Sequence, residues 1–264
     1  MGILNLTPDS FYDGGRHNSG DAALFHVEKM LNEGAAFIDI GAQSTRPNAN
    51  DIGTNEELRR AIPIIENIIK RFPEAVISID TFRAEVAEKA LGAGASMVND
   101  VSAGDDDPKM FDVIIKHKVP YILMHKQGSP KNMQKEPHYT NVVLDIINYF
   151  IPKIEYLHKQ GVSDLMIDPG FGFGKTLEHN YELLNGLDSF KIFELPVLVG
   201  VSRKTMIQKV AGTDVAGALN ATTAAHAIAL MKGAKILRVH DVKEAVEAVK
   251  IYDRVVGSDK GQEG

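Results

Sequence analysis

The chain of 264 residues contains no cysteine. This absence excludes a disulfide framework, a thiolate zinc site and a thiol nucleophile for covalent catalysis. A chain without disulfides is compatible with a reducing compartment, so we expect a cytoplasmic location. The nine histidines show no HExxH or similar ligand spacing, and the sequence therefore gives little support for a zinc site.

The sequence also lacks long apolar runs and clustered basic residues. No apolar stretch reaches the ~20 residues needed to cross a bilayer, and the N-terminus has no signal-peptide pattern. The net charge is -6, with lysine and arginine spread along the chain. Because binding to a nucleic-acid backbone requires a clustered basic field, we expect neither a nucleic acid nor a membrane as a partner.

Eight short apolar or β-branched runs alternate with stretches of helical periodicity. The expected strands are Gly2 to Leu6, Phe37 to Ile40, Val76 to Ile79, Ser96 to Val98, Pro120 to Met124, Leu165 to Ile167, Pro196 to Val199 and Lys235 to Val239. The clearest helical stretches are Asp21 to Asn32, Glu56 to Arg71, Arg83 to Leu91 and Asn141 to Lys159. Strands that are apolar throughout predict a parallel sheet covered by helices, and at this length a single α/β (β/α)8 TIM barrel. An open doubly wound sheet is the alternative.

The domain organisation follows from composition. We expect one catalytic domain over residues 1–256 and a flexible, polar, glycine-rich tail over residues 257–264. The segments Leu6 to Asn18 and Gly41 to Gly53 are longer than a strand-to-helix connection requires and are rich in polar residues, proline and glycine. They are therefore predicted to be long mobile loops after strands 1 and 2.

Nearly every expected strand ends in a polar residue or glycine before its helix. These residues are Asn5, Gly41, Asp80, Asn99, Asp100, His125, Asp168, Gly200, Ser202, Arg238 and His240. In a parallel barrel the carboxyl ends of the strands form one rim, where active sites lie. Several of these residues could instead be helix N-caps, because Asp, Asn and Ser side chains accept hydrogen bonds from free N–H groups. That alternative does not explain Arg238 and His240.

Seven segments, spread in order over essentially the whole chain, resemble the signatures of the dihydropteroate synthase family of pterin-binding barrels. They are Gly2 to Gly15, Ile38 to Asn48, Ser78 to Leu91, Met97 to Gly104, Asp168 to Thr176, Gly200 to Ile207 and Arg238 to Val242. The resemblance implies a transferase of folate biosynthesis that condenses 6-hydroxymethyl-7,8-dihydropterin diphosphate with 4-aminobenzoate to give 7,8-dihydropteroate and pyrophosphate. It further implies Mg²⁺, a homodimer, and sulfonamides as competitors.

The resemblance also assigns the site residues. The pterin-binding residues are Asp80, Asn99, Met124, Asp168, Lys204 and Arg238; the pyrophosphate-binding residues are Asn5, Arg46, Arg238 and His240, with Asn5 helping to hold the magnesium. The 4-aminobenzoate pocket is formed by Phe11, Thr45, Pro47, Phe173, Lys204 and Thr205, and Asp9 and Asp13 belong to the first mobile loop.

The four residues expected to act in catalysis are Arg46, Lys204, Arg238 and His240. Carboxylates suit the donor edge of a pterin, and the planar arginine fork suits phosphate oxygens. Met124 could equally be a core residue.

Lys204 supports a functional role from the residues alone. Ser202 is a plausible N-cap, which would put Arg203 and Lys204 in a first helical turn, where cations oppose the helix dipole. An unfavourable placement suggests function, although an exposed surface lysine is the alternative. The same N-terminus would offer free N–H groups and the Thr205 hydroxyl to a carboxylate.

Three alternative functions have less support in the sequence. The stretch Gly170 to Thr176 is one residue short of a P-loop, so nucleotide binding there is rejected. A methyltransferase domain that presents methyltetrahydrofolate to a corrinoid protein would need the pterin carboxylates but not the anion-binding residues. The STRP, SRK and RVH motifs together weigh against it. Asn5, Arg46 and His240 weigh against a non-catalytic pterin-binding protein.

Overall fold

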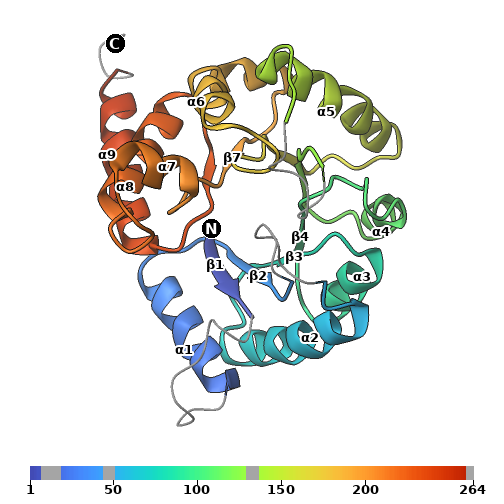
Figure 1. Cartoon of the computed structure of the whole chain (residues 1–264). Coiled ribbons are helices and arrows are strands. Elements are labelled where there is room, and N and C mark those ends of the chain that lie inside the picture. The colour runs from blue at the N-terminus through green and yellow to red at the C-terminus, as the bar shows by residue number, and fades with distance from the viewer. Residues whose placement is uncertain (7–18, 44–50, 129–136, 260–264) are drawn as a thin grey trace.

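In the computed structural model, the described residues form eight short strands at the centre, and helices surround them (Figure 1). The structure describes residues 1–6, 19–43, 51–128 and 137–259. The strands are β1 (Gly2–Asn5), β2 (Ile38–Gly41), β3 (Ile77–Asp80), β4 (Met97–Asp100), β5 (Tyr121–Met124), β6 (Leu165–Asp168), β7 (Leu198–Val199) and β8 (Ile236–Leu237). Each strand falls on one of the eight runs expected from the sequence.

The order of the strands in space follows their order in the chain. Strands β1 to β6 form one parallel sheet, and β7 pairs in parallel with β8. Two isolated parallel bridges connect these sheets: Ile167 with Val197 joins β6 to the start of β7, and Gly2 with Val239 joins the end of β8 to β1. The ring of strands is therefore continuous, which confirms the (β/α)8 barrel over the open doubly wound sheet.

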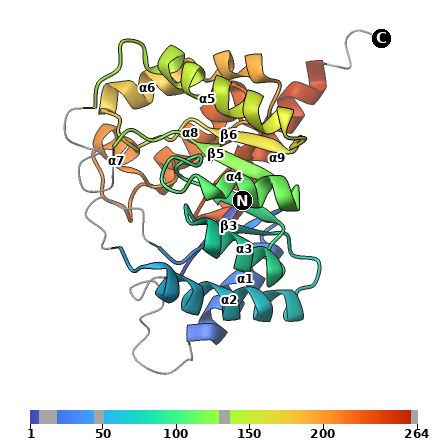
Figure 2. The same ribbon diagram turned by 90° about the vertical axis from the view of Figure 1, so that its right-hand side faces the viewer.

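The helices cover the outer face of the ring, with α1 and α2 on one side of the strands and α5 and α6 on the opposite side (Figure 2). Those that the structure describes are α1 (Ser19–Asn32), α2 (Thr54–Arg71), α3 (Ala84–Gly92), α4 (Lys109–His117), α5 (Val142–Lys159), α6 (Leu177–Asn185), the 3-10 helix η2 (Leu187–Phe193), α7 (Thr205–Ala211), α8 (Leu219–Met231) and α9 (Val242–Asp259). The four helical stretches expected from the sequence correspond to α1, α2, α3 and α5. Two helices, α7 and α8, lie between β7 and β8.

Helix α5 shows how local sequence produces one of these elements. The side chain of Asn141 accepts hydrogen bonds from the backbone N–H groups of Val143 and Leu144, which caps the first turn. Ile146, Phe150 and Ile154 follow at intervals of four residues and are buried. That spacing puts them on one face of the helix, which packs against the barrel.

The barrel has two separate apolar regions. The larger one lies between the strands and the helices and contains outward-facing strand residues such as Ile38 and Ile40. The smaller one, the apolar layer, consists of Met1, Met97, Ile122, Met166 and Leu198, with Phe37 and Ile236 packed against it. Because side chains alternate along a strand, the residue two positions after each member of this layer also faces the barrel interior, nearer the carboxyl ends of the strands.

Some predictions lie outside the described residues. The two predicted mobile loops fall largely on residues 7–18 and 44–50, which the structure does not describe. Helix α9 continues to Asp259, so residues 257–259, which the sequence had assigned to the flexible tail, are helical. Of the described helices, none has the length and hydropathy needed to span a membrane.

Candidate functional site

The candidate site lies at the carboxyl ends of the strands, directly above the apolar layer. Here the inward-facing positions change from apolar to polar. They form a polar layer, which consists of Asp39, Asp80, Asn99, Asp168 and Arg238. Each member comes from a different strand or from the residue that follows it, and four of the five had been predicted as site residues.

Arg238 connects three strands within the polar layer. Its Nε atom donates to Asp39 Oδ2 at 2.6 Å, and its NH2 group donates to Asp80 Oδ2 at 2.6 Å. Asn99 Nδ2 donates to the same Asp39 oxygen at 3.1 Å. The structure therefore brings together three predicted residues, Asp80, Asn99 and Arg238, through Asp39.

Burial governs the ionisation of this group. Removal from water raises the pKa of Asp80, and the guanidinium of Arg238 opposes that rise. Burial would lower the pKa of Arg238, but Asp39 and Asp80 together raise it above its ordinary value, so the arginine stays charged. The Oδ1 atom of Asp39 is buried without a hydrogen-bond partner among the described residues. An unsatisfied buried carboxylate oxygen is costly, which indicates that stability alone did not select this arrangement.

The opposite side of the rim holds a second pair, Asp168 and Lys204. Burial raises the pKa of Asp168, while Lys204 and a hydrogen bond from the Gly170 N–H at 2.8 Å lower it. Burial lowers the pKa of Lys204 to about 8, and the charge of Asp168 opposes that shift. Lys204 Nζ donates to the Phe171 carbonyl at 2.6 Å and lies 4.8 Å from the centre of the Phe173 ring. The predicted residues Asp168, Phe173 and Lys204 are therefore neighbours.

The segment that carries Phe173 is held by its glycines and by a buried lysine. Gly170 has a φ of 74°, and a Cβ atom there would lie 1.8 Å from the His125 carbonyl oxygen, so only glycine fits. Lys175 Nζ donates to the carbonyls of Gly170 at 2.9 Å and Phe173 at 3.2 Å. It also lies 3.0 Å from His125 Nδ1. Burial, followed by the charge of Lys175, lowers the pKa of His125 to about 2, so the neutral ring accepts this hydrogen bond.

The first two strands bring Asn5 beside Asp80. A Cβ atom built on Gly41 would lie 3.7 Å from Asn5 Oδ1 and 3.5 Å from Asp80 Oδ2. The described residues contain no group of three or more His, Cys, Asp or Glu side chains placed to hold a metal. Mg²⁺ is commonly bound through one or two protein oxygens, substrate phosphates and water, and the Asn5 amide oxygen fits that kind of site.

Met124 is buried at the end of β5 but belongs to neither apolar region of the described residues. It faces the barrel interior two residues after Ile122, at the height of the polar layer.

The structure corrects the interpretation of the turn before α7. Helix α7 begins at Thr205, with Lys204 at its N-cap position, so Arg203 and Lys204 are not in a first helical turn as expected. Ser202 is not the N-cap; its Oγ atom instead accepts from the His240 backbone N–H at 3.2 Å and lies 3.2 Å from His240 Nδ1. Thr205 is exposed at the start of the helix. The argument from an unfavourable helix-dipole placement is therefore wrong, and Lys204 remains a candidate because of its position beside Asp168.

Six predicted residues lie outside the part of the chain that the structure describes. They are Asp9, Phe11, Asp13, Thr45, Arg46 and Pro47. The sequence does not identify three residues of this cluster as candidates. They are Asp39, Lys175 and His125, of which only His125 is noted, as a residue at a strand end. The signal for Asp39 was present, because a charged residue in the middle of the apolar run Phe37 to Ile40 must face either the core or the barrel interior.

A parallel barrel with buried carboxylates and cations gathered on its rim has the form of an enzyme active site. The family model described as pterin binding enzyme matches residues 1–240. The dihydropteroate synthase of Escherichia coli strain K12 is 45% identical over 260 residues, which cover 98% of this chain and 92% of that protein. The chain belongs to the pterin-binding enzyme family, and within it to the dihydropteroate synthases.

Solved structures agree with this assignment. A dihydropteroate synthase of Yersinia pestis in complex with a sulfonamide drug has a TM-score of 0.91 and 44% identity, covering 97% of this chain and 93% of that one. The Xanthomonas albilineans dihydropteroate synthase with 4-aminobenzoic acid has a TM-score of 0.90 and 40% identity, covering 96% of this chain and 91% of that one.

Proposed function

We propose that the rim cluster is the place where this chain performs dihydropteroate synthesis. The reaction joins 6-hydroxymethyl-7,8-dihydropterin diphosphate to 4-aminobenzoate and yields 7,8-dihydropteroate and pyrophosphate. The observation that carries the proposal is the position of Arg238, which lies between the buried carboxylates of β2 and β3 on the same rim as Asp168 and Lys204. This rim offers acceptors for a heterocycle and cations for a diphosphate at one place.

The pterin ring is proposed to bind in the polar layer. A pterin edge presents adjacent N–H donors, and a carboxylate can accept two of them at once. Asp168 is proposed for the aminopyrimidine edge, with Asp80 and Asn99 along the remaining ring atoms and Lys204 donating to a ring acceptor. Met124 and Arg238 are proposed to contact the ring faces.

The diphosphate is proposed to bind beside the pterin pocket. Arg238 and His240 are on this side of the described rim, and Arg46 is assigned to the same group of residues although it lies outside the described part. Asn5 is proposed to help hold Mg²⁺, which would stabilise negative charge on the departing pyrophosphate oxygens. Cationic and hydrogen-bonding side chains stabilise the same charge, and this is a large contribution to catalysis of such a reaction.

The 4-aminobenzoate is proposed to bind next to Phe173, with its carboxylate near Lys204 and Thr205. The described parts of this pocket are the Phe173 ring and Lys204 Nζ, which lie 4.8 Å apart. Phe11, Thr45 and Pro47 are proposed to complete it, and sulfonamides are proposed to compete for it, as the sulfonamide complex of the Yersinia relative suggests. Asp9 and Asp13 are proposed to belong to the first loop, which covers the bound substrates.

In the reaction, the C–O bond between the pterin methylene and the diphosphate breaks, and the aniline nitrogen forms a new C–N bond and then loses a proton. The aniline nitrogen is barely basic, so a strong general base is not required. The proposed route is therefore ionising, with the bond to pyrophosphate breaking ahead of attack. The residues of the chain orient the two substrates and stabilise the leaving group.

Two broader properties belong to the same proposal. We propose a homodimer, because Ile228 and Met231 of α8 and Ile251 and Val255 of α9 are large apolar side chains that remain exposed, and α8 and α9 pack together. We propose a cytoplasmic location on the basis of the cysteine-free sequence.

A coupled assay for pyrophosphate release tests the function. We expect release that requires the pterin diphosphate and 4-aminobenzoate together, and that falls sharply when Mg²⁺ is chelated. Asp168→Asn is the matched variant, because it retains the shape of the side chain and removes its charge. Release that is independent of 4-aminobenzoate would contradict the proposed function. Methyl transfer from methyltetrahydrofolate without pyrophosphate release would identify the methyltransferase alternative.

A further inference from the structure

The turns after β7 and β8 lie side by side, and successive residues of the turn after β7 have different partners. In the first turn, Ser202 contacts His240, while Lys204 extends into the site. Between them, Arg203 has a φ of 53°, in the left-handed region that residues other than glycine rarely adopt. No step of the proposed reaction uses the side chain of Arg203.

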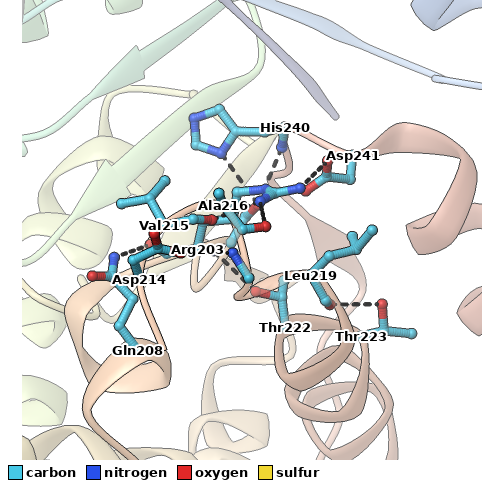
Figure 3. Close-up of polar contacts among 12 residues, drawn as sticks. Arg203, Gln208, Asp214, Val215, Ala216, Leu219, Thr222, Thr223, His240 and Asp241 are labelled. Carbon is cyan, nitrogen blue, oxygen red and sulfur yellow. Dashed lines mark hydrogen bonds and ion pairs between the residues drawn. The ribbon is translucent and has the colours of Figure 1, made fainter. Parts of the chain in front are cut away.

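The guanidinium of Arg203 has partners on two sides (Figure 3). On one side it forms a bidentate ion pair with Asp241, with Nε to Oδ2 at 2.8 Å and NH2 to Oδ1 at 2.9 Å. On the other side NH1 donates to the carbonyl oxygens of Val215 at 2.6 Å and Ala216 at 2.9 Å. One side chain therefore connects the turn after β7, the segment between α7 and α8, and the turn after β8.

The backbone of Arg203 is fixed as well. Its N–H donates to the Thr222 hydroxyl of α8 at 3.1 Å, and the Thr222 side chain is buried. Its carbonyl accepts from Gln208 Nε2 of α7 at 2.7 Å. The unusual backbone conformation is thus held from both directions, as is common where a strained residue has a functional purpose.

We propose that Arg203 and Asp241 are positioning residues, which hold Lys204 and Thr205 at a fixed distance from Arg238 and His240. This inference rests on the proposed function, because it concerns the relative placement of the substrates bound by the two turns. Arg203 immediately precedes Lys204, and Asp241 immediately follows His240, so the ion pair joins the two turns next to the residues proposed to contact substrate. The planar fork is required, because a lysine cannot make two parallel hydrogen bonds with Asp241.

Positioning and simple stabilisation are separated by comparing turnover with stability. The side chains of Arg203 and Asp241 are 20% and 21% exposed, so most of the pair is removed from water. Its loss therefore costs stability as well, because removing one partner of a largely buried pair leaves the other charge uncompensated. Catalysis is far more sensitive, because a displacement of about 1 Å between reacting groups can reduce the rate about 100-fold. Loss of the pair should therefore reduce turnover much more than it reduces stability.

The test is a double-variant cycle with Arg203→Lys and Asp241→Asn. We expect each single variant to reduce kcat/KM for 4-aminobenzoate by roughly 10- to 100-fold. The loss of kcat/KM in the double variant should be no larger than that of the more impaired single variant, because both changes remove the same interaction. The affinity for 6-hydroxymethylpterin, measured by calorimetry, should change less than about threefold, because Asp80, Asn99 and Asp168 do not depend on the pair.

Arg71→Lys is the matched control. Arg71 pairs with Glu28 at 3.0 Å and joins α2 to α1 away from the rim. This control should leave kcat/KM within twofold of the unsubstituted enzyme. If Arg203→Lys folds poorly, Asp241→Asn tests the same interaction from its other partner.

The outcomes are distinguishable. Additive losses in the double variant, or an active enzyme whose single variants stay within twofold, would overturn the positioning role while leaving the proposed function intact. A loss of turnover that only follows the fraction of unfolded protein would also overturn it. If the unsubstituted enzyme releases no pyrophosphate, the proposed function fails, and this inference fails with it.

Discussion

The apolar layer and the polar layer of the barrel interior share strands, among them β4 and β6, but have opposite chemistry. In β5 and β6, Ile122 and Met166 belong to the apolar layer. Two residues further along β6 the chain presents the buried carboxylate of Asp168. Strand alternation directs all of these side chains to the inside of the barrel, so a shift of only two residues changes the interior from hydrocarbon to polar groups.

The two layers differ in what burial contributes to stability. The apolar layer gains free energy by removing hydrocarbon from water. In the polar layer, Asp39 Oδ1 has no hydrogen-bond partner among the described residues, and burial raises the pKa of Asp80. Both features reflect the cost of removing polar oxygens from water. We therefore expect substitutions in the polar layer to affect the reaction, and substitutions in the apolar layer to affect folding.

Arg238→Ala should have the largest effect. Removal of the guanidinium should reduce kcat by roughly 100- to 1,000-fold, as expected for the loss of a group that stabilises developing negative charge. Binding of 6-hydroxymethylpterin, which has no diphosphate, should fall much less. Arg238→Lys is the control, because it keeps the charge near Asp39 and Asp80. Steady-state kinetics and calorimetry check the result, and equal losses in kcat and pterin affinity would mean that the anion-binding role is misassigned.

Ile122→Ala should show the opposite pattern. The side chain is completely buried in the apolar layer. Its truncation should lower the free energy of unfolding by about 2 to 5 kcal/mol, from lost transfer energy and a cavity. Activity measured at a temperature where the variant is fully folded should remain within twofold. Chemical denaturation and pyrophosphate release check this, and a large loss of activity in folded enzyme would show that the two layers are not separable.

Thr205→Val tests a position outside the polar layer, at the start of α7. The change keeps the shape and removes a hydroxyl proposed to contact the carboxylate of 4-aminobenzoate. The KM for 4-aminobenzoate should rise roughly five- to thirty-fold, which corresponds to a loss of about 1 to 2 kcal/mol. Inhibition by a sulfonamide should weaken less. A rise in the KM for the pterin substrate instead would place Thr205 in the pterin site.

The smallest effect concerns pH. Burial lowers the pKa of Lys204 to about 8, so its ammonium is charged below that pH and neutral above it. Because the charged form is the stronger donor, affinity for 6-hydroxymethylpterin should fall about three- to tenfold between pH 7 and 9.5. Lys204→Arg remains charged throughout this range and should lack this component. The ratio of the two affinities removes any ionisation of the ligand itself, and a ratio that does not change with pH would contradict the role of Lys204.

Much of the fold and part of the site could be predicted from the sequence. Short apolar runs bounded by polar residues locate all eight strands, because strands buried on both faces leave a simple pattern. The polar residues at the strand ends identify Asp80, Asn99, Asp168 and Arg238, because parallel strands bring their carboxyl ends together. These predictions depend on local periodicity, which the sequence contains directly.

Other features depend on contacts between distant segments. The hydrogen bond between Arg238 and Asp39 spans 199 positions in the chain, and no local pattern indicates it. Serine is a common N-cap residue, but Ser202 contacts His240 instead and Arg203 has a left-handed backbone conformation. Helix α7 therefore begins only at Thr205. Tertiary contacts therefore override local preference at the very turn that carries Lys204.

The central claim is that the polar layer, and not the apolar layer beneath it, binds the pterin. The most direct measurement is calorimetric titration of 6-hydroxymethylpterin into Asp168→Asn. This change retains the shape of the side chain but removes its charge, and the account predicts a loss of roughly 2 to 4 kcal/mol in binding free energy with the fold intact. An affinity equal to that of the unsubstituted enzyme would contradict the account and move the pterin pocket away from β6.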